Sequence, residues 1–195
     1  MTNPYSFPRY YVQKNIFGLF NQWFRVFDEN GSIVFFCKMR AFKLKEDFRI
    51  LAADKTTELI RIKARNVIDF GATYDVLDVS TEQLLGSFRR KGLKSIFRDE
   101  WVIFDVNEQE VGVVREDSGG MAFLRRMLGG IADLFSPQQH FGSIGNQPVL
   151  AFRQTRNPFL TKTYLDFSSD GQGLLDRRMG IAAAVLFCAI EGKQE

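Results

Sequence analysis

The feature that most constrains this sequence is an uncharged run near its C-terminal end. Twelve consecutive residues, Met179–Ile190, read MGIAAAVLFCAI and carry no charged side chain. A helix that spans a bilayer needs about 20 apolar residues, and at about 1.5 Å per residue this run covers only about 18 Å. Extending the run backwards adds Asp176, Arg177 and Arg178, which are costly inside a bilayer. We therefore expect no transmembrane span.

The same run is expected to form a helix buried on every side. Its alanines, leucine and methionine favour helix, Asp170 or Asp176 can cap its N-terminus, and Gly192 suits its exit. A helix without a polar face must be enclosed by other parts of the chain. The small residues Gly180 and Ala182–Ala184 would let the enclosing wall come close.

Most of the remaining chain is typical of β-hairpins. Four stretches begin with an aromatic residue and β-favouring alternation, pass through an acidic, Asn, Ser or Gly turn, and resume with apolar residues. Asn30-Gly31 is the strongest turn signal among them. The alternation from Thr57 predicts a half-buried strand, and another strand pair is expected around Asn157-Pro158. The four stretches are WFRVFDENGSIVFF from Trp23, YDVLDVSTEQLLGSF from Tyr74, WVIFDVNEQEVGVV from Trp101 and YLDFSSDGQGLL from Tyr164.

One fold accommodates both many antiparallel strands and a helix that must be buried on every side. The predicted fold is mainly β, a closed antiparallel β-barrel of about 12 strands with a central hydrophobic C-terminal α-helix, because closure removes the exposed sheet edges. With 195 residues, residues 1–195 are expected to be a single domain.

One region, residues 119–147, breaks the strand pattern and is interpreted as a helix-loop insertion. The stretch MAFLRRMLGGIADLF from Met121 predicts a helix interrupted by Gly129-Gly130, and SPQQHFGSIGNQP predicts a loop after it. The apolar residues Phe123–Phe135 either pack outside the barrel or contact a membrane or partner, with Arg125 and Arg126 as a basic flank.

Composition places the protein among intracellular globular chains. Hydrophobic residues make up 45% and charged residues 25%, which is ordinary for such a domain. The net charge of +3 permits an anionic partner without demanding one. Cys37 and Cys188 lie in apolar runs and are interpreted as buried thiols in a reducing compartment. The N-terminal residues lack the apolar core of a signal peptide, so we expect a cytoplasmic protein.

Two segments resemble a known family. The stretch YDVLDVSTEQLLGSFRRKGLKSIFRDEWVIFDVNEQEVGVVRED, from Tyr74, is similar to the central part of the tubby C-terminal-like superfamily, in its phospholipid scramblase and LURP-one-related branch. The final DFSSDGQGLLDRRMGIAAAVLFCAI is similar to the last strand and helix of that branch. The resemblance covers residues 8–191 and implies a twelve-stranded barrel around a central helix. It also implies phosphoinositide binding through basic residues, as in tubby domains, or calcium-dependent lipid movement, as in scramblases. Fold analogy is a weak functional argument.

Catalytic and cofactor signals are sparse, and we expect no cofactor. The single histidine, His140, falls in the expected loop without a nucleophile motif around it. One histidine and two separated cysteines do not make a zinc site, and no phosphate-binding or EF-hand loop occurs. The expected hairpin turns contain acidic residues whose side chains can bond to the turn backbone, namely Asp28, Asp78 and Asp105.

Two rows of cations are the candidate lipid headgroup site. The segment FRRKGLKSIFR interleaves five cations with apolar residues, and RIKAR carries three more at strand spacing. Converging Arg and Lys donors suit a phosphate headgroup. The alternative is a solvated strand face neutralised by Asp99 and Glu100. The cations are Arg89, Arg90, Lys91, Lys94 and Arg98 in the first row and Arg61, Lys63 and Arg65 in the second.

A weaker candidate is acidic. Asp166, Asp170 and Asp176 precede the helix, in a region that the scramblase resemblance links to calcium. Their spacing departs from the EF-hand pattern, and Gly171 and Gly173 favour a turn and a helix cap.

Three functions remain open from the sequence. The first is a non-enzymatic, peripheral barrel that binds anionic phospholipid or phosphoinositide headgroups, with a calcium-dependent scramblase-like protein as its variant. The second is an enzyme, and the third is a binder of nucleic acid, which the mild net charge disfavours. The sequence does not indicate an oligomeric state.

Overall fold

The computed structural model describes residues 3–15, 21–40, 47–65, 71–91, 100–116, 138–155 and 160–190. These ranges contain twelve strands followed by the helix α2 (Arg177–Ile190). The strands are β1 (Arg9–Asn15), β2 (Asn21–Asp28), β3 (Ile33–Arg40), β4 (Asp47–Ala52), β5 (Glu58–Ala64), β6 (Thr73–Asp78), β7 (Leu84–Arg90), β8 (Glu100–Phe104), β9 (Glu110–Glu116), β10 (Gln138–Ile144), β11 (Gln147–Thr155) and β12 (Leu160–Asp166).

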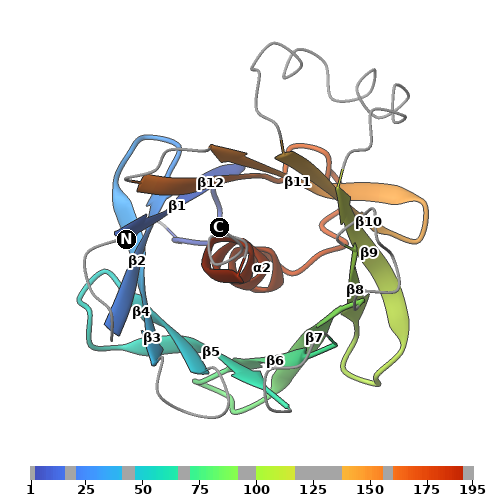
Figure 1. Cartoon of the computed structure of the whole chain (residues 1–195), viewed down its shortest axis with the longest axis horizontal. Coiled ribbons are helices and arrows are strands. Elements are labelled where there is room, and N and C mark those ends of the chain that lie inside the picture. Colours follow the sequence, from blue (N-terminus) through green and yellow to red (C-terminus); the bar gives the residue numbers. More distant parts are fainter. Residues whose placement is uncertain are drawn as a thin grey trace.

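The strands form the predicted closed barrel. Each strand pairs antiparallel with its neighbours in sequence, and β1 pairs with both β2 and β12, which closes the ring (Figure 1). The helix α2 lies inside the ring, nearer to β1 and β12 than to the opposite wall (Figure 1). The expectation of a mainly β barrel with a central C-terminal helix is therefore confirmed.

Three of the four predicted hairpins are present, and acidic turn residues hold them. The stretches from Trp23, Tyr74 and Trp101 form β2–β3, β6–β7 and β8–β9. In the first turn, the Asp28 carboxylate accepts hydrogen bonds from the backbone N–H groups two and four residues later, at 2.9 and 2.8 Å. Asp105 makes the equivalent bonds in β8–β9, so the predicted turn chemistry is confirmed there.

Two sequence interpretations were wrong. The stretch from Tyr164 is not a hairpin, because after β12 the chain makes successive turns and enters α2. The expected loop SPQQHFGSIGNQP contains β10, which pairs with both β9 and β11. Its Gln, His, Gly and Ser residues have weak strand preference alone, and hydrogen bonds on both edges outweigh that preference. Residues 117–137 of the expected insertion lie outside the described residues.

The core is the interface between α2 and the inner faces of the strands. Every residue from Met179 to Ala189 is buried. A Cβ atom added at Gly180 would lie 2.3 Å from ring atoms of Phe167, so only glycine lets this wall approach the helix so closely. The expected role of a small residue at this position is confirmed.

Aromatic side chains contact the C-terminal half of α2 from the walls. The Phe187 ring lies 5.3 Å from that of Trp101 on β8, 4.8 Å from that of Phe152 on β11 and 4.9 Å from that of His140 on β10, between centroids. The expectation that His140 belongs to a loop was therefore wrong. It faces the helix and is only 2% exposed.

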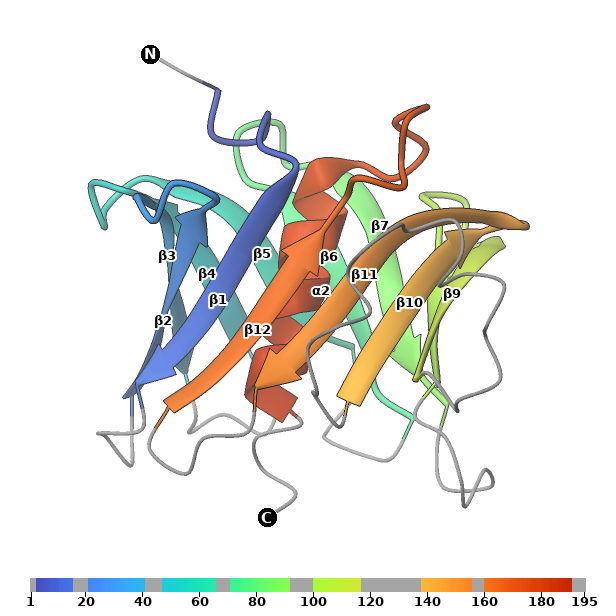
Figure 2. The ribbon, with the colours of Figure 1, turned by 90° about the horizontal axis from the view of Figure 1, so that it is seen from above.

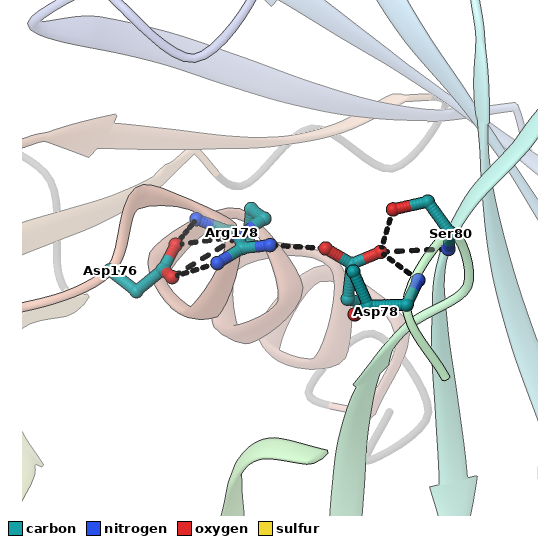
Figure 3. Close-up of polar contacts among 5 residues, drawn as sticks. Asp78, Ser80, Asp176 and Arg178 are labelled. Carbon is teal, nitrogen blue, oxygen red and sulfur yellow. Dashed lines mark hydrogen bonds and ion pairs between the residues drawn. The ribbon is translucent and has the colours of Figure 1, made fainter. Parts of the chain in front are cut away.

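An ionic cluster ties the start of α2 to the barrel wall, and we call it the helix latch (Asp78, Asp176 and Arg178; Figure 3). Arg178 Nη2 lies 2.5 Å from Asp176 Oδ2, and Arg178 Nη1 pairs with Asp78 at the end of β6. Asp176 also accepts a bond from the Arg178 backbone N–H at 2.8 Å, which is the expected N-cap. The latch joins residues 100 positions apart in sequence.

The latch carboxylates have lowered pKa values. For Asp78 the Ser80 hydroxyl is the main cause, aided by backbone N–H groups and by Arg178. Burial by itself would raise the pKa of Asp176, but hydrogen bonds and charge from Arg178 outweigh it. Near the start of α2, burial raises the pKa of Tyr5 to about 12, so this phenol stays neutral beside the ions. Both carboxylates are therefore ionised at neutral pH and hold Arg178 between them.

The buried helix gives the first prediction. Ala183→Asp is expected to abolish cooperative folding, because an unpaired buried charge costs several kcal/mol, about as much as the whole stability of a small domain. Ala183 is 1% exposed. Thermal unfolding followed by circular dichroism measures the effect, with Val106→Asp as control at a position 54% exposed. An Ala183→Asp protein with the wild-type midpoint would contradict the buried position of α2.

The latch gives the second prediction. Asp78→Asn keeps a side-chain acceptor for the turn but removes the charge facing Arg178, and should lower the free energy of unfolding by about 1 kcal/mol at neutral pH. Asp78 has a depressed native pKa. Its contribution is thus complete above the unfolded value of about 3.9 and is lost as pH falls through the native value.

The measurement is chemical denaturation of both proteins at neutral pH and across the acid range. The difference between wild type and Asp78→Asn should shrink as pH falls. Asp105→Asn is the matched control, because Asp105 makes similar turn bonds and has no ion pair within the described part of the chain. An equal loss in the two variants, or a pH-independent difference, would show that the turn rather than the latch matters.

Candidate functional site: a cation–aromatic face of the barrel

The structure separates the two predicted basic rows. Arg61 and Lys63 lie on β5 and Arg89 lies on β7, with β6 between them. Asp75 on β6 lies opposite Lys63 on one side and opposite Ser87 on the other. A carboxylate therefore stands between the rows, and they do not merge into one basic patch.

Carboxylates neutralise three of the six described cations in these rows, whereas Lys63 and Arg89 form no ion pair with any described residue. Arg61 pairs with Glu58 at 2.5 Å, and Lys91 pairs with Glu100 at 2.5 Å. Arg65 pairs with Asp75 at 2.7 Å and Glu108 at 2.8 Å. Arg89 stacks over the ring of Phe104 at 4.5 Å, and Arg90 is half-buried at the end of β7. Lys94 and Arg98 lie outside the described residues. For Arg61, Arg65 and Lys91 the arrangement favours the alternative of a neutralised strand face.

The acidic candidates are also separate from one another. Asp166 pairs with Arg9 at 3.0 Å, and Asp170 accepts bonds from the backbone N–H groups of Leu174 and Leu175 at 2.8 and 3.1 Å. Asp176 belongs to the helix latch. Within the described ranges, no three His, Cys, Asp or Glu side chains group as a metal site requires. These carboxylates form turns and a cap, as the glycines around them indicate.

A different surface concentrates cations and aromatic rings. The outward side chains of β11, β12, β1, β2 and β3 form a continuous wall, and Figure 2 views the barrel from the side of β1, β12 and β11. Alternation along each strand places its apolar partners inside and these side chains outside. We call this surface the cation–aromatic face. It consists of Arg153, Tyr164, Lys162, Tyr11, Arg25, Phe27, Trp23 and Lys38.

Strand register assembles the rings of the face. Tyr11 on β1 lies directly opposite Tyr164 on β12 and Phe27 on β2. Its ring stacks on Phe27 with centroids 4.4 Å apart and planes 7° from parallel, and lies 5.7 Å from Tyr164. Trp23, two outward positions before Phe27, is 38% exposed. Cross-strand aromatic pairs of this kind also stabilise the sheet.

Each cation of the face lies near a ring. Arg153 lies 4.6 Å from the Tyr164 centroid, Lys162 5.4 Å from Tyr11 and Lys38 5.5 Å from Trp23. Arg25 lies 5.9 Å from Phe27. For Lys38, Arg153 and Lys162, the ring orients the cation but supplies no negative charge to compensate it.

Carboxylates are scarce on this wall. Among the described outward residues of the five strands, Asp166 is the single acid, and it pairs with Arg9. Lys38, Arg153 and Lys162 form no ion pair with any described residue. The face is therefore positively charged, whereas half of the described cations in the basic rows are neutralised.

Sequence reasoning missed this face because no single segment contains it. Each strand contributes one to three of its residues, and only register brings them together. A signal was present in the outward positions of single strands, where Trp23, Arg25 and Phe27 alternate with buried residues. The sequence does not state which strands are neighbours across the closure between β1 and β12.

Other candidate groups are buried or neutralised. Burial raises the pKa of Cys188 to about 12 and also raises that of Cys37, so both thiols stay protonated at neutral pH. They are free and buried as predicted. A groove of about 490 Å³ lies along β9 and β10, and its cation Arg115 pairs with Glu100 at 2.7 Å. Among the described residues, no helix has both the length and the apolar character to cross a bilayer.

Comparison with known proteins supports one part of the resemblance seen in the sequence. No curated protein matches the chain. A family model does match, over the region that includes strands β4 to β9 and most of β3. The match is to LURP-one-related proteins and does not identify the scramblase branch. Residues 34–128, just under half of the chain, are similar to the LURP-one-related family, which belongs to the tubby-like superfamily.

Proposed function

We propose that this protein is a non-enzymatic, cytoplasmic barrel that binds anionic phospholipid surfaces through the cation–aromatic face. The observation that supports it is the set of three cations, Lys38, Arg153 and Lys162, that lack a carboxylate partner among the described residues. Lysine and arginine near an anionic membrane are attracted to it. Tryptophan and tyrosine favour the membrane interface.

The proposal assigns the contact to this face rather than to the basic rows. A cation already paired with a carboxylate must lose that partner before it can bind a phosphate. Arg61, Arg65 and Lys91 have such partners at 2.5 to 2.8 Å. On the cation–aromatic face, Lys38, Arg153 and Lys162 have rings as neighbours instead.

Nucleic acid fits the face less well than a membrane. Single strands bind through bases that stack on open aromatic faces, usually along a groove. Here the rings are already occupied, because Tyr11 and Phe27 stack on each other and Arg153 covers Tyr164. The outer wall of a closed barrel is also convex. A membrane surface needs neither open ring faces nor a groove.

Enzymatic activity finds little support among the groups that could carry it. A nucleophilic thiol needs a low pKa and access, whereas Cys37 and Cys188 are buried with raised pKa values. His140 packs against Phe187 in the core. A binding role uses the charged outer wall and leaves this core intact.

The expected affinity is modest. Each cation near an anionic surface contributes about 1 kcal/mol, so three contribute about 3 kcal/mol, weaker than a millimolar contact. Insertion of Trp23 and Tyr side chains into the interface must add to it. Because exposed charges are screened within about 8 Å at physiological salt, binding should weaken as salt rises.

The third prediction compares two charge-neutralising variants. Lys38→Gln, Arg153→Gln and Lys162→Gln together should lower co-sedimentation with anionic vesicles about tenfold or more, given about 1 kcal/mol per cation. The matched control, Arg61→Gln, Arg65→Gln and Lys91→Gln together, removes the same net charge from the basic rows. It should lower binding less than about twofold, because those charges are already compensated.

Both triple variants are first tested for wild-type thermal unfolding. Loss in the control with no loss in the face variant would move the contact to the basic rows. Equal loss in both would show a response to net charge alone. No binding of wild type to any anionic vesicle would exclude the proposal.

The fourth prediction uses the two tryptophans. Trp23 is 38% exposed on the face, whereas Trp101 is fully buried in the barrel. In a Trp101→Phe protein, brominated lipids in anionic vesicles should quench the remaining Trp23 fluorescence. In a Trp23→Phe protein, they should leave Trp101 fluorescence unchanged. Quenching of Trp101 alone would contradict docking through this face.

A further inference from the structure

We infer that the cation–aromatic face recognises the density of negative charge on a membrane and contacts several lipid headgroups at once, rather than holding one headgroup in a pocket. This inference rests on the proposed function and names the ligand chemistry of the same face. It assigns the ligand as a surface of phosphate-bearing lipids without stereochemical preference.

The first argument is the distance that separates the cations. Lys38 on β3 and Arg153 on β11 are separated by β2, β1 and β12. With about 4.8 Å between neighbouring strands, they lie about 19 Å apart along the sheet. Tight phosphate binding needs donors that converge within about 3 Å of the same oxygens. A single headgroup therefore does not reach both ends of the face.

The second argument is that the rings keep the cations apart. Arg153 lies against Tyr164, Lys162 against Tyr11 and Lys38 against Trp23, so each cation has its own ring, and Lys38 is separated from the other two by the stacked pair of Tyr11 and Phe27. The stacked rings of Tyr11 and Phe27 fill the centre of the face. Converging on one phosphate would break these contacts, whereas separate headgroups can approach each cation where it stands.

The third argument is the shape of the wall. The groove is lined by residues of β9 and β10, of the turn after β10 and by Pro148 at the start of β11, whereas the cation–aromatic face uses Arg153 farther along β11 and residues of β12, β1, β2 and β3. Convex surfaces contact a plane over a broad area and select weakly among headgroups of equal charge. Contact with several lipids at once makes binding rise steeply with their mole fraction, as in multivalent association.

The experiment compares headgroups at matched charge. Phosphatidylcholine vesicles are made anionic with either phosphatidylserine or phosphatidylinositol bisphosphate, and both are adjusted to the same measured surface potential. Wild-type protein should bind the two within about twofold, because potential sets the attraction. Binding should rise more than linearly with the mole fraction of phosphatidylserine. Soluble inositol trisphosphate should not displace the protein beyond the effect of an equally ionic salt.

A preference of about tenfold or more for phosphatidylinositol bisphosphate at matched potential would overturn the inference, because it requires converging donors. Displacement by stoichiometric inositol trisphosphate, or binding linear in mole fraction, would do the same. The Lys38→Gln, Arg153→Gln, Lys162→Gln variant should lose affinity for both vesicles by the same factor, and a selective loss would also overturn it. No binding to either vesicle, or tighter binding to a single-stranded oligonucleotide, would instead reject the proposed function.

Discussion

The burial of an uncharged helix inside a closed sheet is the constraint on which the rest of this structure depends. The helix α2 has no polar face, so it needs apolar walls on every side, and the inner faces of the strands need something apolar to pack against. Closure between β1 and β12 satisfies both needs and removes the sheet edges. The glycine at position 180 and the Phe167 ring show how close the fit is.

Two carboxylates near the start of α2 offset an unfavourable electrostatic interaction between its arginines and the helix dipole. Arginines at a helix N-terminus face the positive end of the helix dipole, which is unfavourable. The latch compensates for this by placing Arg178 between Asp176 and Asp78, and Arg177 stacks over the Phe167 ring at 4.2 Å. The carboxylate from β6 also fixes where the helix enters the barrel, so the same ions that offset the dipole set the position of α2.

Because α2 and the inward-facing side chains fill the interior, the outer wall is the part of the described barrel that is available for binding. Its charge is not uniform, because carboxylates compensate Arg61, Arg65 and Lys91 around β5 to β8, whereas Lys38, Arg153 and Lys162 on the wall from β11 to β3 lie against rings. Cations on the two walls therefore differ in how far their charge is compensated. The two walls differ in where their acidic residues lie rather than in where their basic residues lie. For this reason the net charge of the chain did not indicate which wall is positively charged.

The sequence by itself determined the architecture, because period-two alternation, Asp and Asn-Gly turns and the uncharged run are local signals with local physical causes. The sequence pattern predicted a loop in place of β10, where pairing on both edges outweighs the weak strand preference of Gln, His and Gly. Only the tertiary structure decided the candidate site. Whether Lys91 is a free cation depends on Glu100 beside it, and whether Tyr11 meets Tyr164 depends on the register between β1 and β12, in which Arg9 pairs with Asp166, 157 positions away. Such contacts arise from the closure of the barrel, and no short window of sequence contains them.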